Sequence, residues 1–145
     1  MRKITVIHGP NLNLLGRRNP DVYGTSTLKQ INERISARAK QLGVTVKVFQ
    51  SNREGEIIDA IHAAQNSCGI IINPGAYTHT SVAIRDAIEA VAVPAIEVHI
   101  SNIFKRESFR HKSLIAPVCA GQITGLAEYS YLLAIDYFAR RKQGS

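Results

Sequence analysis

Ile4-Thr5-Val6-Ile7, followed directly by His8-Gly9-Pro10, is the stretch that decides the fold. All four residues of the run are β-branched, and such residues favour an extended backbone. The glycine and the proline that follow mark the end of the strand. A short run with so little polar character is typical of a strand buried on both faces, as in parallel sheets. The sequence therefore predicts a buried strand whose carboxyl end carries His8-Gly9-Pro10.

Short apolar runs of the same kind recur further along the chain. They cover residues 44–49, 70–72 and 95–98. The segments between and after these runs carry apolar residues at spacings of three to four, which is the period of an amphipathic helix. These segments predict helices over about 28–42, 57–62, 82–91 and 126–141. Thr25 and Ser26 are candidate caps for the first helix.

Strands and helices that alternate in this way form a parallel sheet with helices on both faces. The predicted fold is α/β, a three-layer, doubly wound, flavodoxin-like parallel sheet with strand order 2-1-3-4-5. A chain of 145 residues has the usual size of one domain, so we expect residues 1–145 to form a single domain. Because ligands of such sheets bind outside the carboxyl ends of the strands, the segments after the strands are the candidates for a site.

Composition excludes several classes of protein. The chain is 45% hydrophobic and 20% charged, as globular proteins are, and its apolar runs are far shorter than the ~18 residues of a membrane span. The N-terminus lacks a signal-peptide layout, so we expect a cytoplasmic protein with no membrane partner. Cys68 and Cys119 lie in apolar stretches without CxxC spacing, which indicates buried free thiols.

The net charge of +7 has two interpretations. A basic surface attracts nucleic acid, but it attracts an anionic metabolite equally well. Several of the basic residues, including Arg140, Arg141 and Lys142, have the sequence context of a tail. Neither of the common phosphate-binding patterns, GxGxxG or GxxxxGKS/T, occurs in the chain. We therefore expect a small-molecule substrate and no nucleic acid.

Residues 9–24 have neither a helical nor a strand period and are bounded by glycines. Long loops of this kind in a compact domain are commonly lids or binding loops, and we refer to residues 9–24 as the lid. The lid carries Arg17, Arg18 and Tyr23. A free tyrosine has a pKa of about 10, and nearby guanidinium groups stabilise the phenolate that acts as a base. A catalytic tyrosine and a surface tyrosine beside solvated arginines both fit this pattern.

Two further segments carry polar side chains at strand ends. Asn73 begins a tight turn, where its side chain and free amides can face a ligand. Glu97 and His99 alternate along the run that starts at residue 95, so both lie on one face and the carboxylate can orient the imidazole. The pair suits a general acid or base, and also a structural histidine. A metal site from this pair and His79 lacks the usual ligand spacing, so we expect no metal and no cofactor.

The segment after His99 is a candidate anion site. Ser101 and its neighbouring amides can receive a carboxylate. Arg106 and Arg110 are four residues apart on a predicted helical turn, which directs both guanidinium groups to one side.

Four motifs, taken in order, closely resemble those of the type II dehydroquinases. They are Gly9-Pro10-Asn11-Leu12-Asn13-Leu14-Leu15-Gly16, Arg18-x-Pro20-x-x-Tyr23-Gly24, Asn73-Pro74-Gly75-Ala76-Tyr77-Thr78-His79-Thr80-Ser81, and Glu97-Val98-His99-Ile100-Ser101-Asn102 with Arg106 and Arg110. The resemblance spans nearly the whole chain. It implies an enzyme of the shikimate pathway or of quinate catabolism that eliminates water from 3-dehydroquinate in the anti sense, through an enolate, without metal or Schiff base.

The resemblance also implies catalytic roles by motif position. Tyr23 corresponds to the base, and Arg18 to the arginine that favours its ionised form. His99 corresponds to the general acid, held by Glu97. Asn11 corresponds to the residue that stabilises the enolate together with a bound water.

The implied substrate-binding residues lie in the later motifs. They are Asn73, Ile100 and Ser101 at the substrate carboxylate, His79 and Arg110 at the ring hydroxyls, and Asp86 contributed by a neighbouring subunit. Arg106 corresponds to an arginine that acts with the lid. The implied assembly is a homododecamer, a tetramer of trimers.

Three places depart from the family's pattern. Asn19 stands where a carboxylate is usual, Phe104 and Lys105 replace a more usual His-Ala pair, and Ala127 with Glu128 lies where glycine is common in the last helix. These departures concern the lid and subunit contacts, because none removes a catalytic group. The alternative that stays open is a non-catalytic, flavodoxin-like module that binds a small anion.

Overall fold

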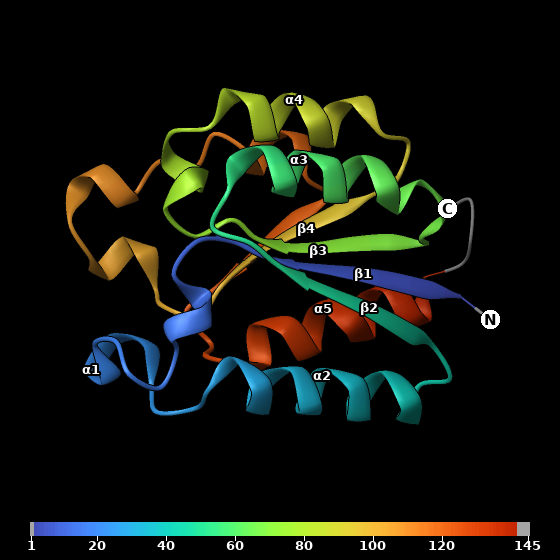
Figure 1. The fold of residues 1–145 in the computed structure, drawn as a ribbon, viewed down its shortest axis with the longest axis horizontal. Helices are drawn as coiled ribbons and strands as arrows, with labels where there is room; N and C mark the ends of the chain where they lie inside the picture. The colour runs from blue at the N-terminus through green and yellow to red at the C-terminus, as the bar shows by residue number, and fades with distance from the viewer. Residues whose placement is uncertain (1, 142–145) are drawn as a thin grey trace.

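The computed structural model describes residues 2–141, so Lys142 lies outside the described residues. Five parallel strands form one sheet in the order β2-β1-β3-β4-β5 (Figure 1). The strands are β1 (Lys3–His8), β2 (Thr45–Gln50), β3 (Gly69–Asn73), β4 (Ala95–His99) and β5 (Gly121–Thr124). The α-helices are α1 (Pro20–Tyr23), α2 (Leu28–Gln41), α3 (Glu54–Ala63), α4 (Val82–Ala90) and α5 (Tyr129–Arg140). The predicted doubly wound α/β fold and its strand order are confirmed.

Helices cover both faces of the sheet. The helices α2 and α5 pack on one face, and α3 and α4 pack on the other (Figure 1). Successive side chains of a strand point to opposite faces, so β1 contributes to two separate cores. Ile4 and Val6 pack with the core under α2 and α5, whereas Ile7 packs with the core under α3 and α4. Burial on both faces explains the β-branched composition of β1.

Short 3₁₀ turns follow the strands and gather at the carboxyl end of the sheet, at the left of Figure 1. These turns are η1 (Leu12–Leu14), η3 (Gly75–His79), η4 (Ile103–Lys105) and η5 (Ser108–Arg110). Two more, η2 (Ala64–Asn66) and η6 (Ala116–Val118), lie before β3 and β5. A side-chain carbon on Gly9 would lie 2.6 Å from the backbone of Pro74, and the Gly9 amide donates to the Asn73 carbonyl over 2.7 Å. The ends of β1 and β3 are therefore held in direct backbone contact.

Several element boundaries differ from the sequence-based predictions. The lid is not free of regular structure, because it contains η1 and α1. The cap of α2 is Thr27, which exchanges two hydrogen bonds with Gln30, and not Thr25 or Ser26. The strand β5 has only one large apolar residue, Ile123, and the apolar runs did not reveal it.

The last helix starts at Tyr129, three residues later than predicted. Gly125 and Ala127 have φ angles of 90° and 53°, and these left-handed conformations cannot continue into a right-handed helix. Glycine adopts such a conformation without steric cost, which gives a physical reason why glycine suits position 127. Ala127 therefore lies in the loop before the helix, and not in the helix.

Composition also gave expectations about membrane spans and about the two cysteines. None of the helices between residues 2 and 141 combines the length and the apolar character that crossing a bilayer needs. Cys68 and Cys119 are free thiols, as predicted, but both are only half-buried, so the prediction that they are buried was wrong. Burial, together with the charge of Glu97, raises the pKa of Cys119 to about 12.

Replacement of Gly69 by alanine should destabilise the fold. A methyl group on Gly69 would overlap the ring of Phe138, which is 1% exposed and cannot move aside without disturbing the core. We expect a loss of about 1–3 kcal/mol, the usual cost of overpacking. Gly121→Ala is the matched control, because a methyl group there meets no atom within 4 Å. Equal urea midpoints for the two variants would contradict this account of the Gly69 contact.

His8, the last residue of β1, should make stability depend on pH. Its side chain is fully buried, and this burial lowers its pKa to about 4, against the raising effect of its hydrogen bond with Asn32. The unfolded chain takes up the proton near pH 6.5, so stability is complete above pH 6.5 and falls as the pH decreases towards 4, by about 3 kcal/mol.

The measurement compares the free energy of unfolding of the wild type and His8→Asn between pH 6.5 and 4.5. The variant should show a shallower decrease. His62→Gln removes an exposed histidine of α3 and controls for the loss of a histidine side chain. Parallel curves for the wild type and His8→Asn would refute the role of His8.

Candidate active site

A pocket lies at the carboxyl ends of β1, β3 and β4. Its lining includes every predicted site residue except Glu97 and Asp86: Asn11, Arg18, Tyr23, Asn73, His79, His99, Ile100, Ser101, Arg106 and Arg110. Five further residues line the same pocket: Pro10, Leu12, Gly75, Ala76 and Ile103. Segments far apart in the sequence therefore meet where the topology of the sheet predicts a ligand site.

Tyr23 is held by two arginines. Arg18 Nη2 donates to the tyrosine hydroxyl over 3.1 Å, and Arg106 Nη1 donates to it over 2.6 Å. Both guanidinium groups also lie over the ring, with Cζ 4.1 Å and 5.2 Å from the ring centroid. Two cationic donors directed at one oxygen leave that oxygen as an acceptor, which is the state a base requires.

Arg106 and Arg110 do not share a helical turn, so that prediction was wrong. Arg106 follows η4, and Arg110 ends the separate turn η5. Arg110 Nε donates to Glu107 over 2.9 Å. Both arginines still line the pocket, because the two short turns are adjacent in space.

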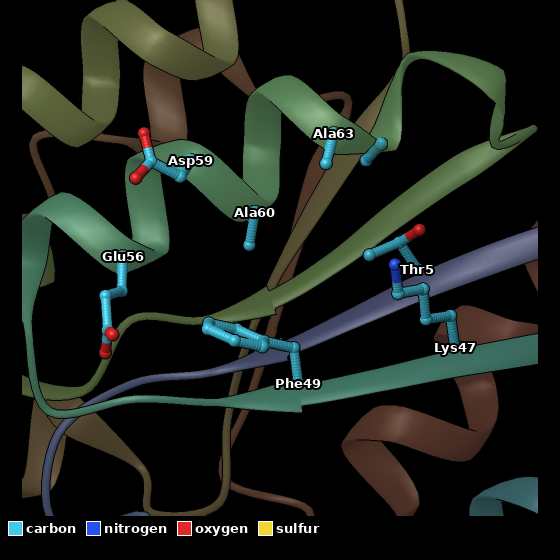
Figure 2. Close-up of a pocket in the computed structure, with 8 residues that line it drawn as sticks. Thr5, Lys47, Phe49, Glu56, Asp59, Ala60 and Ala63 are labelled. Atoms are coloured by element: carbon cyan, nitrogen blue, oxygen red, sulfur yellow. The ribbon is translucent and has the colours of Figure 1, made fainter.

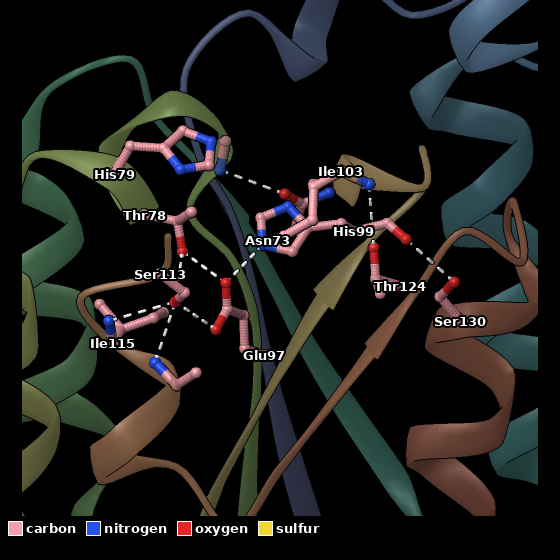
Figure 3. A network of polar contacts seen from close by, with 12 residues as sticks. Asn73, Thr78, His79, Glu97, His99, Ile103, Ser113, Ile115, Thr124 and Ser130 are labelled. Carbon is pink, nitrogen blue, oxygen red and sulfur yellow. Dashed lines mark hydrogen bonds and ion pairs between the residues drawn. The ribbon is translucent and has the colours of Figure 1, made fainter. Parts of the chain in front are cut away.

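Glu97 and His99 of β4 form the predicted pair. His99 Nε2 lies 2.5 Å from Glu97 Oε2 (Figure 3). Glu97 is fully buried behind His99, which lines the pocket. Burial alone would raise the pKa of Glu97, but the hydrogen bond and the charge of His99, with further hydrogen bonds from two hydroxyl groups, outweigh it and lower that pKa. Glu97 is therefore a carboxylate, and the proton between the pair belongs to His99 Nε2.

Thr78 and Ser113 supply those two hydroxyl groups, and sequence reasoning did not identify either of them. Thr78 Oγ1 donates to Glu97 Oε2 over 2.5 Å, and Ser113 Oγ donates to Oε1 over 2.7 Å (Figure 3). Thr78 lies inside the third motif, and that position was the one signal in the sequence. Ser113 lies outside all four motifs, and nothing in its sequence context marks it.

The polar residues after β3 have defined partners. Asn73 is 3% exposed, and its Oδ1 accepts a hydrogen bond of 3.1 Å from the Gly75 amide. His79 Nδ1 donates to the Lys112 carbonyl over 2.8 Å, which leaves Nε2 as the ring nitrogen for a ligand. Asn11, after β1, has a left-handed backbone with φ of 69°.

Asp86 and Asn19, which the sequence analysis singled out, do not line the pocket. Asp86 is exposed on α4 and does not line this pocket. Asn19 caps α1 through its backbone, with its carbonyl accepting from the amides of Val22 and Tyr23. Its φ of 29° lies in the left-handed region, which asparagine tolerates better than most residues. The side chain of Asn19 makes no cap hydrogen bond.

A second, more open hollow lies between β2 and α3 (Figure 2). Phe49, Ala60 and Ala63 give it an apolar floor, with Lys47 and Glu56 at its sides. It lies beside the edge strand and contains no predicted site residue, so the pocket at the strand ends is the candidate active site. Within residues 2–141, no three His, Cys, Asp or Glu side chains are grouped so that they could hold a metal ion.

Comparison with known proteins gives the family of this chain. The family model described as "Dehydroquinase class II" matches residues 2–139. A curated 3-dehydroquinate dehydratase of Halothermothrix orenii is 60% identical over 137 residues, which are 94% of this chain and 93% of that protein.

Two solved structures of type II dehydroquinases are similar to this chain as well. The crystal structure of the type II dehydroquinase from Butyrivibrio crossotus has a TM-score of 0.93 at 48% identity and covers 94% of this chain and 97% of its own. The type II dehydroquinase from Propionibacterium acnes has a TM-score of 0.94 at 40% identity, over 97% and 98% of the two chains. The family model covers nearly every described residue, the four motifs converge on one pocket, and this chain therefore belongs to the class II dehydroquinase family.

Proposed function

We propose that this chain eliminates water from 3-dehydroquinate to give 3-dehydroshikimate, as a hydro-lyase of the shikimate pathway or of quinate catabolism. The observation that carries the proposal is the environment of Tyr23. Its hydroxyl oxygen accepts from two guanidinium groups at the pocket that also receives His99. A base and an acid are thus available at one pocket, from separate elements.

Tyr23 removes the proton next to the ketone. Such a proton is only weakly acidic, so most of the barrier comes from the negative charge that develops on the carbonyl oxygen. Arg18 and Arg106 keep the tyrosine oxygen directed as an acceptor. Asn11, which lines the pocket, stabilises the enolate together with a bound water. Fixed donors of this kind lower such barriers by several kcal/mol, roughly 3–4 for one donor.

His99 then protonates the departing hydroxyl group, which leaves as water. Its Nε2 is engaged by Glu97, so Nδ1 is the nitrogen that faces the substrate. An acid must carry a proton on Nδ1 as well, and the buried carboxylate of Glu97 lies against the other ring nitrogen. Glu97 acts through His99 and does not itself line the pocket.

The rest of the pocket holds the substrate. Its carboxylate binds Asn73 and the amides of Ile100 and Ser101. His79, through Nε2, and Arg110 bind the ring hydroxyls. The hydrogen bonds of Asn73 with Gly75 and of His79 with Lys112 support these roles, because they fix the orientation of both side chains.

Phenylalanine at position 23 and alanine at position 99 should each reduce turnover by roughly 10²–10⁴-fold, the usual contribution of a general base or acid. Tyr23→Phe retains the ring between the two arginines, and His99→Ala removes the acid. The assay follows the conjugated enone in the ultraviolet after addition of 3-dehydroquinate. Tyr137→Phe and His62→Gln are matched controls, because both side chains are exposed away from the pocket.

Near-normal turnover in Tyr23→Phe would refute the assigned base. Pure wild-type protein that binds 3-dehydroquinate without forming the enone would instead indicate the non-catalytic anion-binding module. Inactivation by borohydride in the presence of substrate would indicate a lysine Schiff base and contradict the enolate route.

We also propose that the chain, as one domain over residues 1–145, assembles into a cytoplasmic homododecamer of four trimers. Asp86 would then reach the pocket of a neighbouring subunit. Its exposure on α4, away from its own pocket, supports this role. The exposed apolar side chains of Tyr129 and Leu133 on α5 offer surface for subunit contacts.

Co-expression of two inactive variants tests the shared site. Asp86→Ala lacks the contributed carboxylate, and Tyr23→Phe lacks the base. A mixed trimer contains sites with an intact Tyr23 and an intact Asp86 from the neighbour, so activity should return in part. Light scattering measures the assembly. No recovery of activity in mixed particles, or a monomeric mass for the wild type, would contradict the proposal.

A further inference from the structure

A hydrogen-bonded series of polar side chains, buried except for the half-buried Asn32, runs behind the pocket and joins four elements of the fold. Asn32 of α2 lies at its outer end, with Oδ1 2.8 Å from His8 Nε2. His8 Nδ1 of β1 lies 2.9 Å from the hydroxyl oxygen of Tyr131 on α5. Asn73 Nδ2 of β3 donates to the same hydroxyl oxygen over 2.9 Å. The series ends where Asn73 Oδ1 accepts a hydrogen bond from the Gly75 amide.

The Gly75 amide fixes the direction of every hydrogen bond in this series of side chains. A backbone N–H only donates, so the Asn73 oxygen must face Gly75 and the Asn73 amino group must face Tyr131. The Tyr131 oxygen therefore accepts from Asn73, and its own proton must go to His8 Nδ1. His8 then carries its proton on Nε2 and donates to Asn32 Oδ1. No other arrangement satisfies all of these groups.

Burial of these side chains enforces this arrangement of hydrogen bonds. His8 and Tyr131 are fully buried, and Asn73 is 3% exposed. Burial lowers the pKa of His8 to about 4 and raises the pKa of Tyr131, against the lowering effect of its hydrogen bond from Asn73. Both side chains are therefore neutral, as the direction of the hydrogen bonds requires. A buried amide that loses one of these partners loses a large part of its stabilisation.

We propose that Tyr131 and His8 are positioning residues that hold the amide of Asn73 with one N–H facing the substrate carboxylate. The proposal rests on the proposed function, because it takes the ligand of Asn73 to be the carboxylate of 3-dehydroquinate. Asn73 has two amide hydrogens, and Tyr131 receives one of them. The second remains for the ligand in the pocket that Asn73 lines.

Loss of the Tyr131 hydroxyl removes the acceptor that keeps the amide in this orientation. The amide can then rotate and present its oxygen to the substrate carboxylate, where two acceptors repel each other. Binding of the substrate suffers both before and in the transition state, so the loss is one of uniform binding. Transfer of the protons by Tyr23 and His99 is not affected directly.

Tyr131→Phe tests the proposal, because it retains the buried ring and removes only the hydroxyl. We expect the KM for 3-dehydroquinate to rise roughly tenfold, with kcat within about twofold of the wild type. Tyr137→Phe on the same helix is the matched control, since that tyrosine is 45% exposed. A general loss of folding would lower the fraction of active protein and thus kcat, and would leave KM unchanged.

Two replacements of His8 separate its hydrogen bonds from its volume. His8→Leu fills the space but offers Tyr131 no acceptor, and it should raise KM as Tyr131→Phe does. His8→Asn provides an acceptor and a donor on one amide, so its KM should lie much closer to that of the wild type than the KM of His8→Leu does. If His8→Leu does not fold, Tyr131→Phe still decides the matter.

A double-mutant cycle with Asn73→Ala gives the decisive outcome. Once the Asn73 side chain is absent, Tyr131→Phe should cause no further increase in KM. Additive effects, or an unchanged KM in Tyr131→Phe when the wild type is active, would overturn this inference and leave the proposed function intact. A wild type without dehydratase activity would overturn both.

Discussion

The direct backbone contact between the ends of β1 and β3 is the constraint on which the rest of the site depends. The chain leaves β1 for the edge strand β2 through α2, and it leaves β3 for β4 through α4 on the opposite face (Figure 1). Two connections that depart to opposite faces open a crevice between adjacent strand ends. Gly9 permits the contact, because any side chain there would collide with Pro74. The lid and Asn73 are thereby brought to one crevice.

The second determinant of the site is a charge without access to water. An isolated buried carboxylate is very unfavourable, and several hydrogen bonds are needed to compensate for the loss of hydration. Glu97 obtains them from β4 itself, from η3 and from the loop before β5, through His99, Thr78 and Ser113. These contacts join the segments that follow β3 and β4. The carboxylate of Glu97 thus both orients His99 and joins these segments behind the pocket.

The sequence predicted the features that depend on local patterns. The strands β1 to β4 are rich in β-branched and other apolar residues, and the alternation of Glu97 and His99 is local as well. Matched motifs predicted the pocket lining. Contacts between residues distant in the sequence left no local signal. Only the family resemblance linked Arg106 to the lid, where it meets Tyr23 across 83 positions, and nothing linked His8 to Tyr131 across 123.

Backbone conformation was the other source of error. The apolar residues from Leu126 onwards fit a helical period, but the left-handed residues Gly125 and Ala127 delay the helix to Tyr129. No side-chain pattern reports a left-handed alanine. In the lid, Pro20 at the first position of α1 was a helix-start signal, but the helix is too short to display a period.

The arginines at the pocket have an effect beyond contact distance. At about 0.1 M salt, electrostatic attraction reaches roughly 10 Å into solution. Arg18, Arg106 and Arg110 therefore draw an anion towards the crevice before it touches the protein, and the rate of encounter decreases as ionic strength rises. The product of the proposed reaction keeps the carboxylate of the substrate. The same field that speeds the arrival of the substrate consequently slows the departure of the product.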